Sequence, residues 1–164
     1  AHVQLLGSGM ILQEVLEAAR LLESDYCVSA DVWSVTSFTE LRKDLLAVER
    51  ANRLHAGKSV AKSFVETQLT DETSPVIAAT DYVRLHAEQI RGAVRAPYTC
   101  LGTDGFGRSD TRKALRDFFE VDATWILLAA IEALVKQEKL TQAVLLEVMK
   151  RYAISPNKPD PMRT

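Results

Sequence analysis

Short apolar segments alternate with amphipathic segments along most of this chain. Four such apolar segments cover residues 3–6, 26–35, 75–79 and 98–101. Their length and their β-branched residues are typical of buried strands, whereas the segments that follow them carry apolar residues at helical spacing. Alternating strands and helices with short connections predict a mainly parallel sheet that helices cover on both faces. We therefore expect an α/β fold with three α/β/α layers, about five strands, and one edge strand that can run antiparallel.

Turn and capping residues delimit the predicted helices. A Gly-Ser-Gly turn at residues 7–9 precedes the first helix, and Ser37 is a suitable cap for the second. A short helix is expected over residues 59–69, and Asp81 is placed to cap the helix that follows the third strand. Thr141 divides the last apolar stretch into two helices. These boundaries predict short connections throughout the fold.

Composition indicates one soluble globular domain over residues 1–164. The chain has 164 residues, of which 47% are apolar and 26% charged, and its formal net charge is -2. The charges are interspersed, so no basic stripe indicates a nucleic acid or an anionic membrane as a partner. The longest apolar run, residues 125–134, is interrupted by Glu132 and is shorter than the roughly 20 residues of a membrane span. With no signal-peptide pattern at the start, a cytoplasmic protein is expected, with an extended Pro-rich tail at residues 155–164.

The reactive side chains form no catalytic or metal-binding pattern in the sequence. Cys27 and Cys100 are far apart and lack a neighbouring Cys or His at metal-ligand spacing, so we expect both to be reduced core residues. His86 shares a predicted helix face with Val83 and Ile90, which favours a packed histidine over a general base. We therefore assign no catalytic, cofactor-binding or metal-ligating residue to this chain.

A glycine-rich loop follows the fourth predicted strand. Three glycines within six residues describe a loop of fixed shape, because glycine permits positive φ angles and close backbone approach. Asp104 can form an Asx turn on its own backbone, and Ser109 or Asp110 can cap the following helix. The glycine loop covers residues 102–110, and its candidate interface or entrance residues are Asp104, Gly105, Phe106, Gly107, Arg108, Ser109 and Asp110.

Two interpretations of this loop remain open. Either Phe106 is the plug of a rigid connection between strand and helix, or it is exposed with Arg108 at an interface or at an active-site entrance. Arg108 can pair with Asp110 nearby or with a carboxylate of another subunit. The residue types alone are compatible with both.

The Gly-Ser-Gly turn is also a candidate phosphate site. Free amides at the start of a helix attract anions, and Asp31 lies about 20 residues downstream, where a ribose contact is found in dinucleotide-binding folds. However, Leu12 stands where the dinucleotide fingerprint requires Gly or Ala. A nucleotide-binding α/β domain remains an alternative function, as does a stand-alone protein-interaction module.

Several segments in order resemble one known family. They are VQLLGSG at residues 3–9, SADVWSVTSFTEL at 29–41, AVER at 47–50, ATDY at 79–82, LGTDGFGRSDTR at 101–112 and FFEVD at 118–122. The chain resembles the C-terminal domain of the transketolase-like thiamine diphosphate enzymes, in particular the homodimeric bacterial pyruvate dehydrogenases. It departs from their pattern at three positions: Leu45 replaces a usual Gly, Ala51 an aromatic residue, and Ala56 a Pro.

The resemblance implies a division of labour. Enzymes of this family decarboxylate pyruvate on thiamine diphosphate and reductively acetylate the lipoyl group of dihydrolipoyl acetyltransferase, their partner in the pyruvate dehydrogenase complex. They hold thiamine diphosphate and Mg²⁺ on domains that this chain lacks. The resemblance thus implies a non-catalytic domain of a homodimeric oxidoreductase, which supports dimer assembly and flanks the active-site entrance. Residues 104–110 are the segment expected nearest that entrance.

Overall fold

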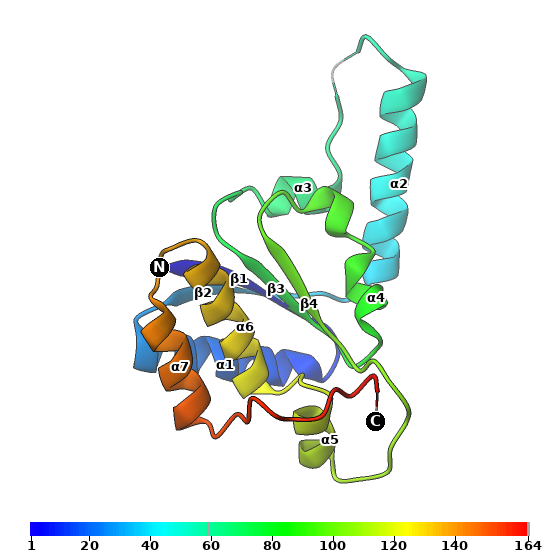
Figure 1. The fold of residues 1–164 in the computed structure, drawn as a ribbon. Helices are drawn as coiled ribbons and strands as arrows, with labels where there is room; N and C mark the ends of the chain where they lie inside the picture. Colours follow the sequence, from blue (N-terminus) through cyan, green and yellow to red (C-terminus); the bar gives the residue numbers. More distant parts are fainter. Residues whose placement is uncertain (59, 164) are drawn as a thin grey trace.

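Four parallel strands form the central sheet of the computed structural model, which describes residues 1–58 and 60–163 (Figure 1). The strands are β1 (His2–Gly7), β2 (Ser29–Ser34), β3 (Val76–Ala79) and β4 (Tyr98–Leu101), in the order β2-β1-β3-β4. Within the described residues, the sheet thus has four strands rather than five, and every pair is parallel. The expected α/β class is confirmed, and the expectation of a fifth, antiparallel edge strand is wrong.

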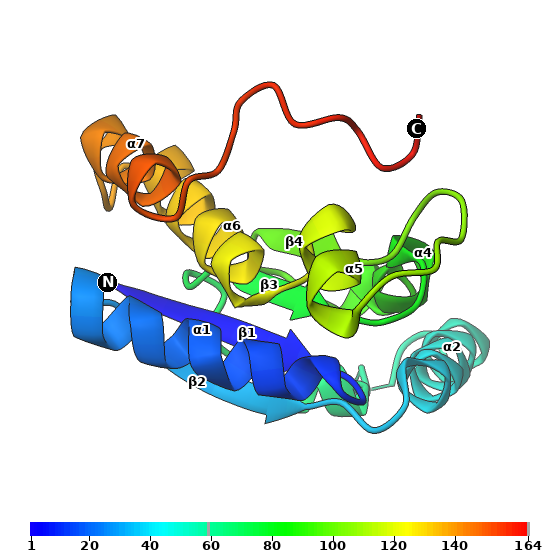
Figure 2. The same ribbon diagram turned by 90° about the horizontal axis from the view of Figure 1, so that it is seen from below.

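Helices cover both faces of the sheet, as the alternating pattern predicts. On one face lie α1 (Ile11–Tyr26), α6 (Ala123–Lys136) and α7 (Gln142–Arg151), with α5 (Arg112–Phe118) beside the end of the sheet (Figure 2). The other face carries α2 (Phe38–Leu54), α3 (Phe64–Gln68), α4 (Arg84–Glu88) and a 3-10 turn, η1 (Arg91–Ala93). The upper half of α2 and the loop after it project away from the sheet (Figure 1).

Alternation along the strands separates two hydrophobic cores. In β1, Val3 and Leu5 face the helices α1 and α6, whereas Leu6 faces the opposite core with Phe38 of α2. All four of these side chains are almost completely buried. A strand directs successive side chains to opposite faces, so a central strand with apolar residues on both faces must be covered twice. This pattern produces the three layers.

Capping residues define several helix starts as expected. The Ser37 hydroxyl oxygen accepts a hydrogen bond from the Glu40 amide at 3.2 Å. Thr141 is the residue before α7 as expected, but its side chain makes no capping hydrogen bond. The short helix expected over residues 59–69 is observed only at Phe64–Gln68, where Ser63 and Glu66 form a capping box. Residue 59 lies outside the described residues. The Ser37 cap depends on neighbouring residues only, so local sequence was sufficient to place it, whereas the capping box at Ser63 was not predicted.

The helix after β3 differs from its prediction. Asp81 does not cap it: α4 starts only at Arg84, and its N-cap residue is Val83, whose side chain makes no capping hydrogen bond. The helix ends at Glu88 and gives way to η1. The single helix expected to reach Val94 is therefore divided, which leaves Asp81 free of a structural role in the helix.

The last residues of the chain run back across the molecule to α5 and the glycine loop (Figure 2). Lys158 attaches this tail, because its ammonium donates to the carbonyl oxygen of Phe118 at 2.8 Å and lies 3.2 Å from Glu120 Oε1. The same ammonium lies 5.0 Å from the centre of the Trp125 ring, a cation–π distance. The tail is thereby held beside the carboxyl-terminal edge of the sheet.

Candidate functional site

The carboxyl ends of β1 and β3 lie side by side at the place in the sheet where the direction of strand addition reverses. From β1 the chain continues outward to β2, and from β3 it continues in the opposite direction to β4. Ligands of open parallel sheets bind in the crevice outside such a switch point. Here the Ser8 hydroxyl donates to Thr80 Oγ1 at 3.0 Å, and the same oxygen accepts from the Tyr82 amide at 3.2 Å. These contacts join the two strand ends and position Asp81 at the edge.

The first half of the glycine loop is fixed to the start of α4. Thr103 donates through its amide to the Tyr82 carbonyl at 2.9 Å and through its hydroxyl to the Asp81 carbonyl at 2.7 Å. A Cβ atom on Gly102 would lie 2.5 Å from the Arg84 nitrogen, so only glycine allows the two segments to approach this closely. The loop therefore has one shape at this end.

Asp104 completes this attachment, although differently from the prediction. Its Oδ1 accepts from the Arg84 amide at 2.9 Å, and its Oδ2 lies 3.2 Å from Arg84 Nε, an ion pair without the alignment of a hydrogen bond. The expected Asx turn on its own backbone is not the contact that Asp104 makes. It instead occupies the start of α4, where a carboxylate is favoured by the helix dipole.

The second half of the loop projects outward. Phe106 is 75% exposed, so its interpretation as the plug of the loop is wrong. Arg108 places its guanidinium carbon 4.1 Å from the centre of the Phe118 ring rather than beside Asp110. Gly107 and Ser109 are also exposed. Neither of the two expected residues caps α5: Asp110 accepts from the Thr111 amide, and the Thr111 hydroxyl oxygen is the cap.

Behind the outer half of the loop lies a cleft of about 590 Å³, which we call the arginine cleft. It is open to solvent and is bounded by the loop, the start of α1, the end of β3 and α5. Its apolar lining comes mainly from Met10, Leu115, Phe119 and Val121. Its charged lining residues are Asp81, Arg108, Asp110, Arg112 and Arg116. This volume is in the range of pockets that bind small molecules.

One charged residue of the cleft is clearly structural. Arg116 donates to Glu14 Oε1 at 2.6 Å, and Glu14 Oε2 accepts from the Ala123 amide at 3.0 Å. Both side chains are mostly buried. Glu14 thus joins α1 to α5 and to the start of α6, and it is the reason why α5 has a fixed place beside the cleft. Local sequence does not predict this contact, because Glu14 and Arg116 are 102 residues apart along the chain.

Asp81 has a different environment. Although the residue as a whole is exposed, partial withdrawal of its carboxyl from water raises its pKa above the ordinary value, against the opposing charges of Arg116 and Arg112. Perturbed carboxyl groups in a cleft are typical of functional sites. The prediction of Asp81 as a helix cap missed this placement, because capping and cleft residues both follow the ends of strands.

The candidate phosphate turn is largely committed to internal hydrogen bonds. The Ser8 amide donates to the Ala79 carbonyl, and the Leu12 amide donates to the Gly9 carbonyl. A Cβ on Gly7 would lie 2.9 Å from Leu12 Cα, so α1 packs closely on β1 despite the bulky side chain at position 12. The Ser8 and Leu12 amides are thus used within the fold.

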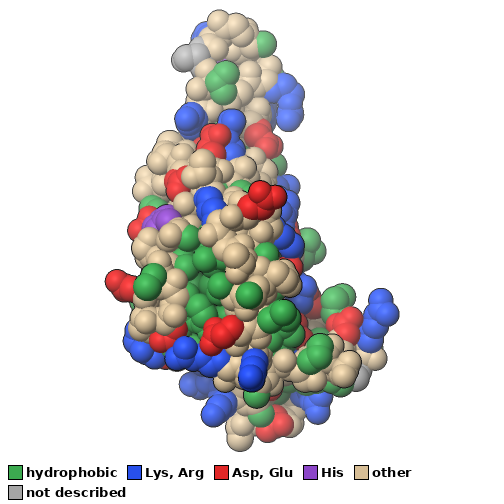
Figure 3. Space-filling model, turned by 60° about the vertical axis from the view of Figure 1, so that its left-hand side comes forward, with side chains coloured by type: hydrophobic (Ala, Val, Ile, Leu, Met, Phe, Trp, Pro, Cys, Tyr) green, Lys and Arg blue, Asp and Glu red, His purple; other side chains and the backbone are tan. Residues whose placement is uncertain are grey.

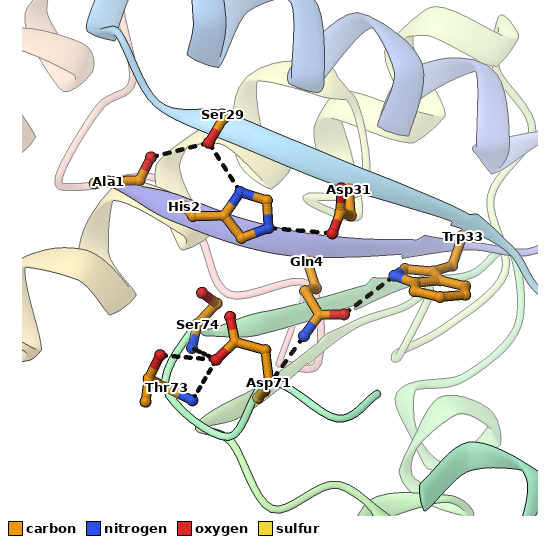
Figure 4. A network of polar contacts seen from close by, with 9 residues as sticks. All are labelled: Ala1, His2, Gln4, Ser29, Asp31, Trp33, Asp71, Thr73 and Ser74. Atoms are coloured by element: carbon orange, nitrogen blue, oxygen red, sulfur yellow. Dashed lines mark hydrogen bonds and ion pairs between the residues drawn. The ribbon is translucent and has the colours of Figure 1, made fainter. Parts of the chain in front are cut away.

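Asp31 lies too far along β2 to serve that turn. It stands in the middle of the strand, opposite Gln4, and its carboxylate accepts a contact from His2 Nε2 at 3.2 Å (Figure 4). Nearby, Gln4 accepts from the Trp33 indole at 3.1 Å. This polar network lies on β1, β2 and the loop before β3, and the ribose contact imagined for Asp31 is not supported by its position.

The other reactive side chains lie apart from the cleft. His86 packs edge-on against Phe38, with ring centres 5.5 Å apart, as expected of a packed histidine. Cys100 is buried and reduced as predicted, but Cys27 is exposed at the end of α1, which contradicts its prediction as a core residue. Among residues 1–58 and 60–163, no group of three or more His, Cys, Asp or Glu side chains is arranged to hold a metal ion.

Acidic and basic side chains are mixed on the face of the molecule that Figure 3 shows, around a hydrophobic region. None of the helices in the described part of the chain is both long enough and apolar enough to span a bilayer.

One protein-family model matches the part of the chain that contains the sheet and the glycine loop. The model of the transketolase-like TK C-terminal domain matches residues 1–122. The chain belongs to this family. The match covers the sheet and ends just before α6, so the last two helices and the tail lie beyond it.

Full-length relatives extend the likeness over nearly the whole chain. The pyruvate dehydrogenase E1 component of Pseudomonas aeruginosa is 57% identical over 98% of this chain, and that of Cupriavidus necator is 51% identical over 98%. The corresponding protein of Escherichia coli K12 is 46% identical over 97% of the chain. The chain spans only 18% of the length of each of these relatives.

A solved structure supports the fold. The chain is similar to a protein described as "Split gene transketolase, inactive beta4 tetramer", with a TM-score of 0.51 over 82% of this chain and 38% of that one. Sequence identity is 18%, so this likeness concerns the fold alone.

Proposed function

We propose that this chain is the C-terminal domain of a thiamine diphosphate-dependent pyruvate dehydrogenase, the E1 component of a pyruvate dehydrogenase complex. The single observation that carries this proposal is the 57% identity to such a component over 98% of the chain. The parent enzyme decarboxylates pyruvate and reductively acetylates the lipoyl group of dihydrolipoyl acetyltransferase. It is a cytoplasmic homodimer in this proposal.

The domain has a structural role in that enzyme. Thiamine diphosphate and Mg²⁺ are held by other domains of the parent, which lie outside this chain. The residues of the chain supply the scaffold: a sheet with two cores and, at its carboxyl edge, a loop held at Gly102 and Asp104. In this proposal the chemistry of the cofactor takes place on the other domains of the parent. This domain positions the loop and supplies contact area.

The exposed half of the glycine loop is the contact surface. Phe106 and Arg108 are presented to solvent by a backbone that is fixed on either side, which lowers the entropy lost on association. Aromatic residues and arginines contribute most to the energy of interfaces. In this proposal the loop packs against the other domains or the second subunit near the active-site entrance.

The full-length enzyme tests this role through variants in the loop. Phe106→Ala and Arg108→Ala are expected to weaken the dimer at least tenfold and to reduce the rate of acetyl transfer. Phe64→Ala is the matched control, because Phe64 is also exposed (58%) but lies on α3, away from the loop. Unchanged dimerisation and activity in both loop variants would refute the proposed contact.

The cofactor assignment has its own test. Calorimetric titration of this chain with thiamine diphosphate and Mg²⁺ is expected to give no binding heat, whereas the full-length enzyme binds both. Stoichiometric binding by this chain would place a cofactor site here and overturn the division of labour.

A further inference from the structure

The arginine cleft contains two opposite charges without partners. Among residues 1–58 and 60–163, the Asp81 carboxylate accepts no hydrogen bond and has no cation within 4.0 Å, and the Arg112 guanidinium has no carboxylate within that distance. Both residues line the cleft. Opposite charges that face one cleft without touching leave room for a ligand between them.

The other charged groups of the cleft are already engaged. Arg116 is paired with Glu14, Asp110 accepts from the Thr111 amide, and Arg108 stacks on the Phe118 ring. Asp81 and Arg112 are the two charged lining residues to which the described part of the chain offers no such contact. The raised pKa of Asp81 reflects partial loss of water at its carboxyl, and loss of water strengthens any charge-assisted contact made there.

Apolar side chains also line the cleft. They include Met10, Leu115, Phe119 and Val121. The volume of about 590 Å³ is sufficient for a molecule with an apolar body and two polar ends. The negative charge of Asp81 would repel a simple anion, and the positive charge of Arg112 would repel a simple cation.

We propose that the arginine cleft binds a small zwitterion, with its cationic end on Asp81, its anionic end on Arg112 and its apolar body over Leu115 and Phe119. This site goes beyond the proposed function, which assigns no ligand to this chain. Each end of the ligand satisfies a charge that the fold leaves unpaired, and the two contacts together select a bifunctional molecule over either half of it.

Three related probes test this selection by calorimetry at low salt. The first is 6-aminohexanoate, which carries both charges, and the others are hexanoate and hexylamine, which carry one each. The zwitterion is expected to bind about tenfold more tightly than either single-charge probe, the difference that one charge-assisted contact contributes.

Variants assign each end to its residue. Asp81→Asn is expected to lower the affinity for 6-aminohexanoate about tenfold, to that of hexanoate, and Arg112→Gln is expected to lower it to that of hexylamine. Lys113→Gln is the matched control, since it removes the same charge from the next residue, which is exposed and does not line the cleft. It is expected to change the affinity less than twofold.

Three results would overturn the zwitterion site. They are the absence of saturable binding of 6-aminohexanoate at tens of millimolar, equal affinity for all three probes, and equal losses in Arg112→Gln and Lys113→Gln. Because this test uses ligand binding to the present chain, its outcome is independent of the dimer and activity measurements on the full-length enzyme. Failure of one proposal is therefore distinguishable from failure of the other.

Discussion

The carbonyl oxygen of Pro161 occupies the place that a side chain on Gly105 would need. A Cβ on Gly105 would lie 2.2 Å from that oxygen, and the φ angle of Gly105 is +116°, a value that favours glycine. The tail and the glycine loop are thus in contact through a position where only hydrogen fits. Together with the Lys158 contacts, this makes the tail part of the support of the loop.

Gly105→Ala is therefore expected to destabilise the chain by about 1–3 kcal/mol, through both backbone strain and the clash with the tail. The free energy of unfolding in urea and proteolysis of the tail measure the effect. Gly107→Ala is the control, because nothing lies within 4 Å of its Cβ position and its φ is not in the positive range. If the two variants are equally stable, the contact does not hold the loop.

Glu14 is expected to contribute more to stability than a neighbouring surface glutamate on the same helix. Glu14→Gln replaces the carboxylate that binds Arg116 and the Ala123 amide, at an expected cost of about 1–3 kcal/mol. Glu17→Gln removes a pair with Arg20 that is largely exposed, at an expected cost below about 1 kcal/mol. Chemical denaturation of both variants measures the difference in the free energy of unfolding. Equal losses of stability would show that the buried Glu14–Arg116 pair contributes no more than the exposed Glu17–Arg20 pair.

Local sequence patterns predicted the elements of this fold well. The four strands overlap the four apolar segments. β1, β3 and β4 are largely buried, as apolar residues on both faces predict, whereas the edge strand β2 has no fully buried residue. Ser37 was predicted as a cap because it directly precedes Phe38 at the start of the helix, and its hydroxyl oxygen accepts from the Glu40 amide, three residues away. Such features depend on contacts within one turn or one strand, and these are present in a short window of sequence.

What the sequence did not predict are contacts between distant segments. Asp104 was expected to bond its own backbone, but it bonds Arg84, which is 20 residues away along the chain. The sequence left open whether Phe106 is a plug or is exposed, and the structure shows it 75% exposed. The neighbouring Gly105 lies against Pro161 of the tail, a contact between segments far apart in the chain. The arginine cleft exists only because the loop, α5 and two strand ends meet, so no single motif indicated it.

Asp71 is expected to make stability fall in acid. Hydrogen bonds from Ser74 and Thr73 hold the pKa of its carboxyl well below the ordinary value of 3.8. A carboxyl whose pKa is lower in the folded state stabilises the fold above its unfolded pKa, and this contribution is lost as the pH falls below about 5 toward the folded pKa. Asp71→Asn is therefore expected to be less stable at pH 7 and to lose less stability between pH 5 and pH 3.

Unfolding in urea at several pH values measures this dependence. Thr73→Val serves as an intermediate case, because it removes the hydroxyl that donates to Asp71 Oδ1 at 2.7 Å and leaves the two amide donors in place. It is expected to reduce the acid dependence only in part. An acid dependence in Asp71→Asn as steep as that of the unmodified chain would contradict the assignment to this carboxyl.

The two cysteines are expected to react very differently with iodoacetamide. Burial raises the pKa of the Cys100 thiol to about 12, and the side chain is only 6% exposed, so both its thiolate fraction and its access are low. Cys27 is exposed at the left-handed end of α1, with a φ of +52°. Mass spectrometry of the native chain at pH 8 should therefore find one label on Cys27, a second label only after unfolding, and none on native Cys27→Ser. Equal labelling rates of the two thiols in the native chain would mean that the β4 core opens far more readily than its burial implies.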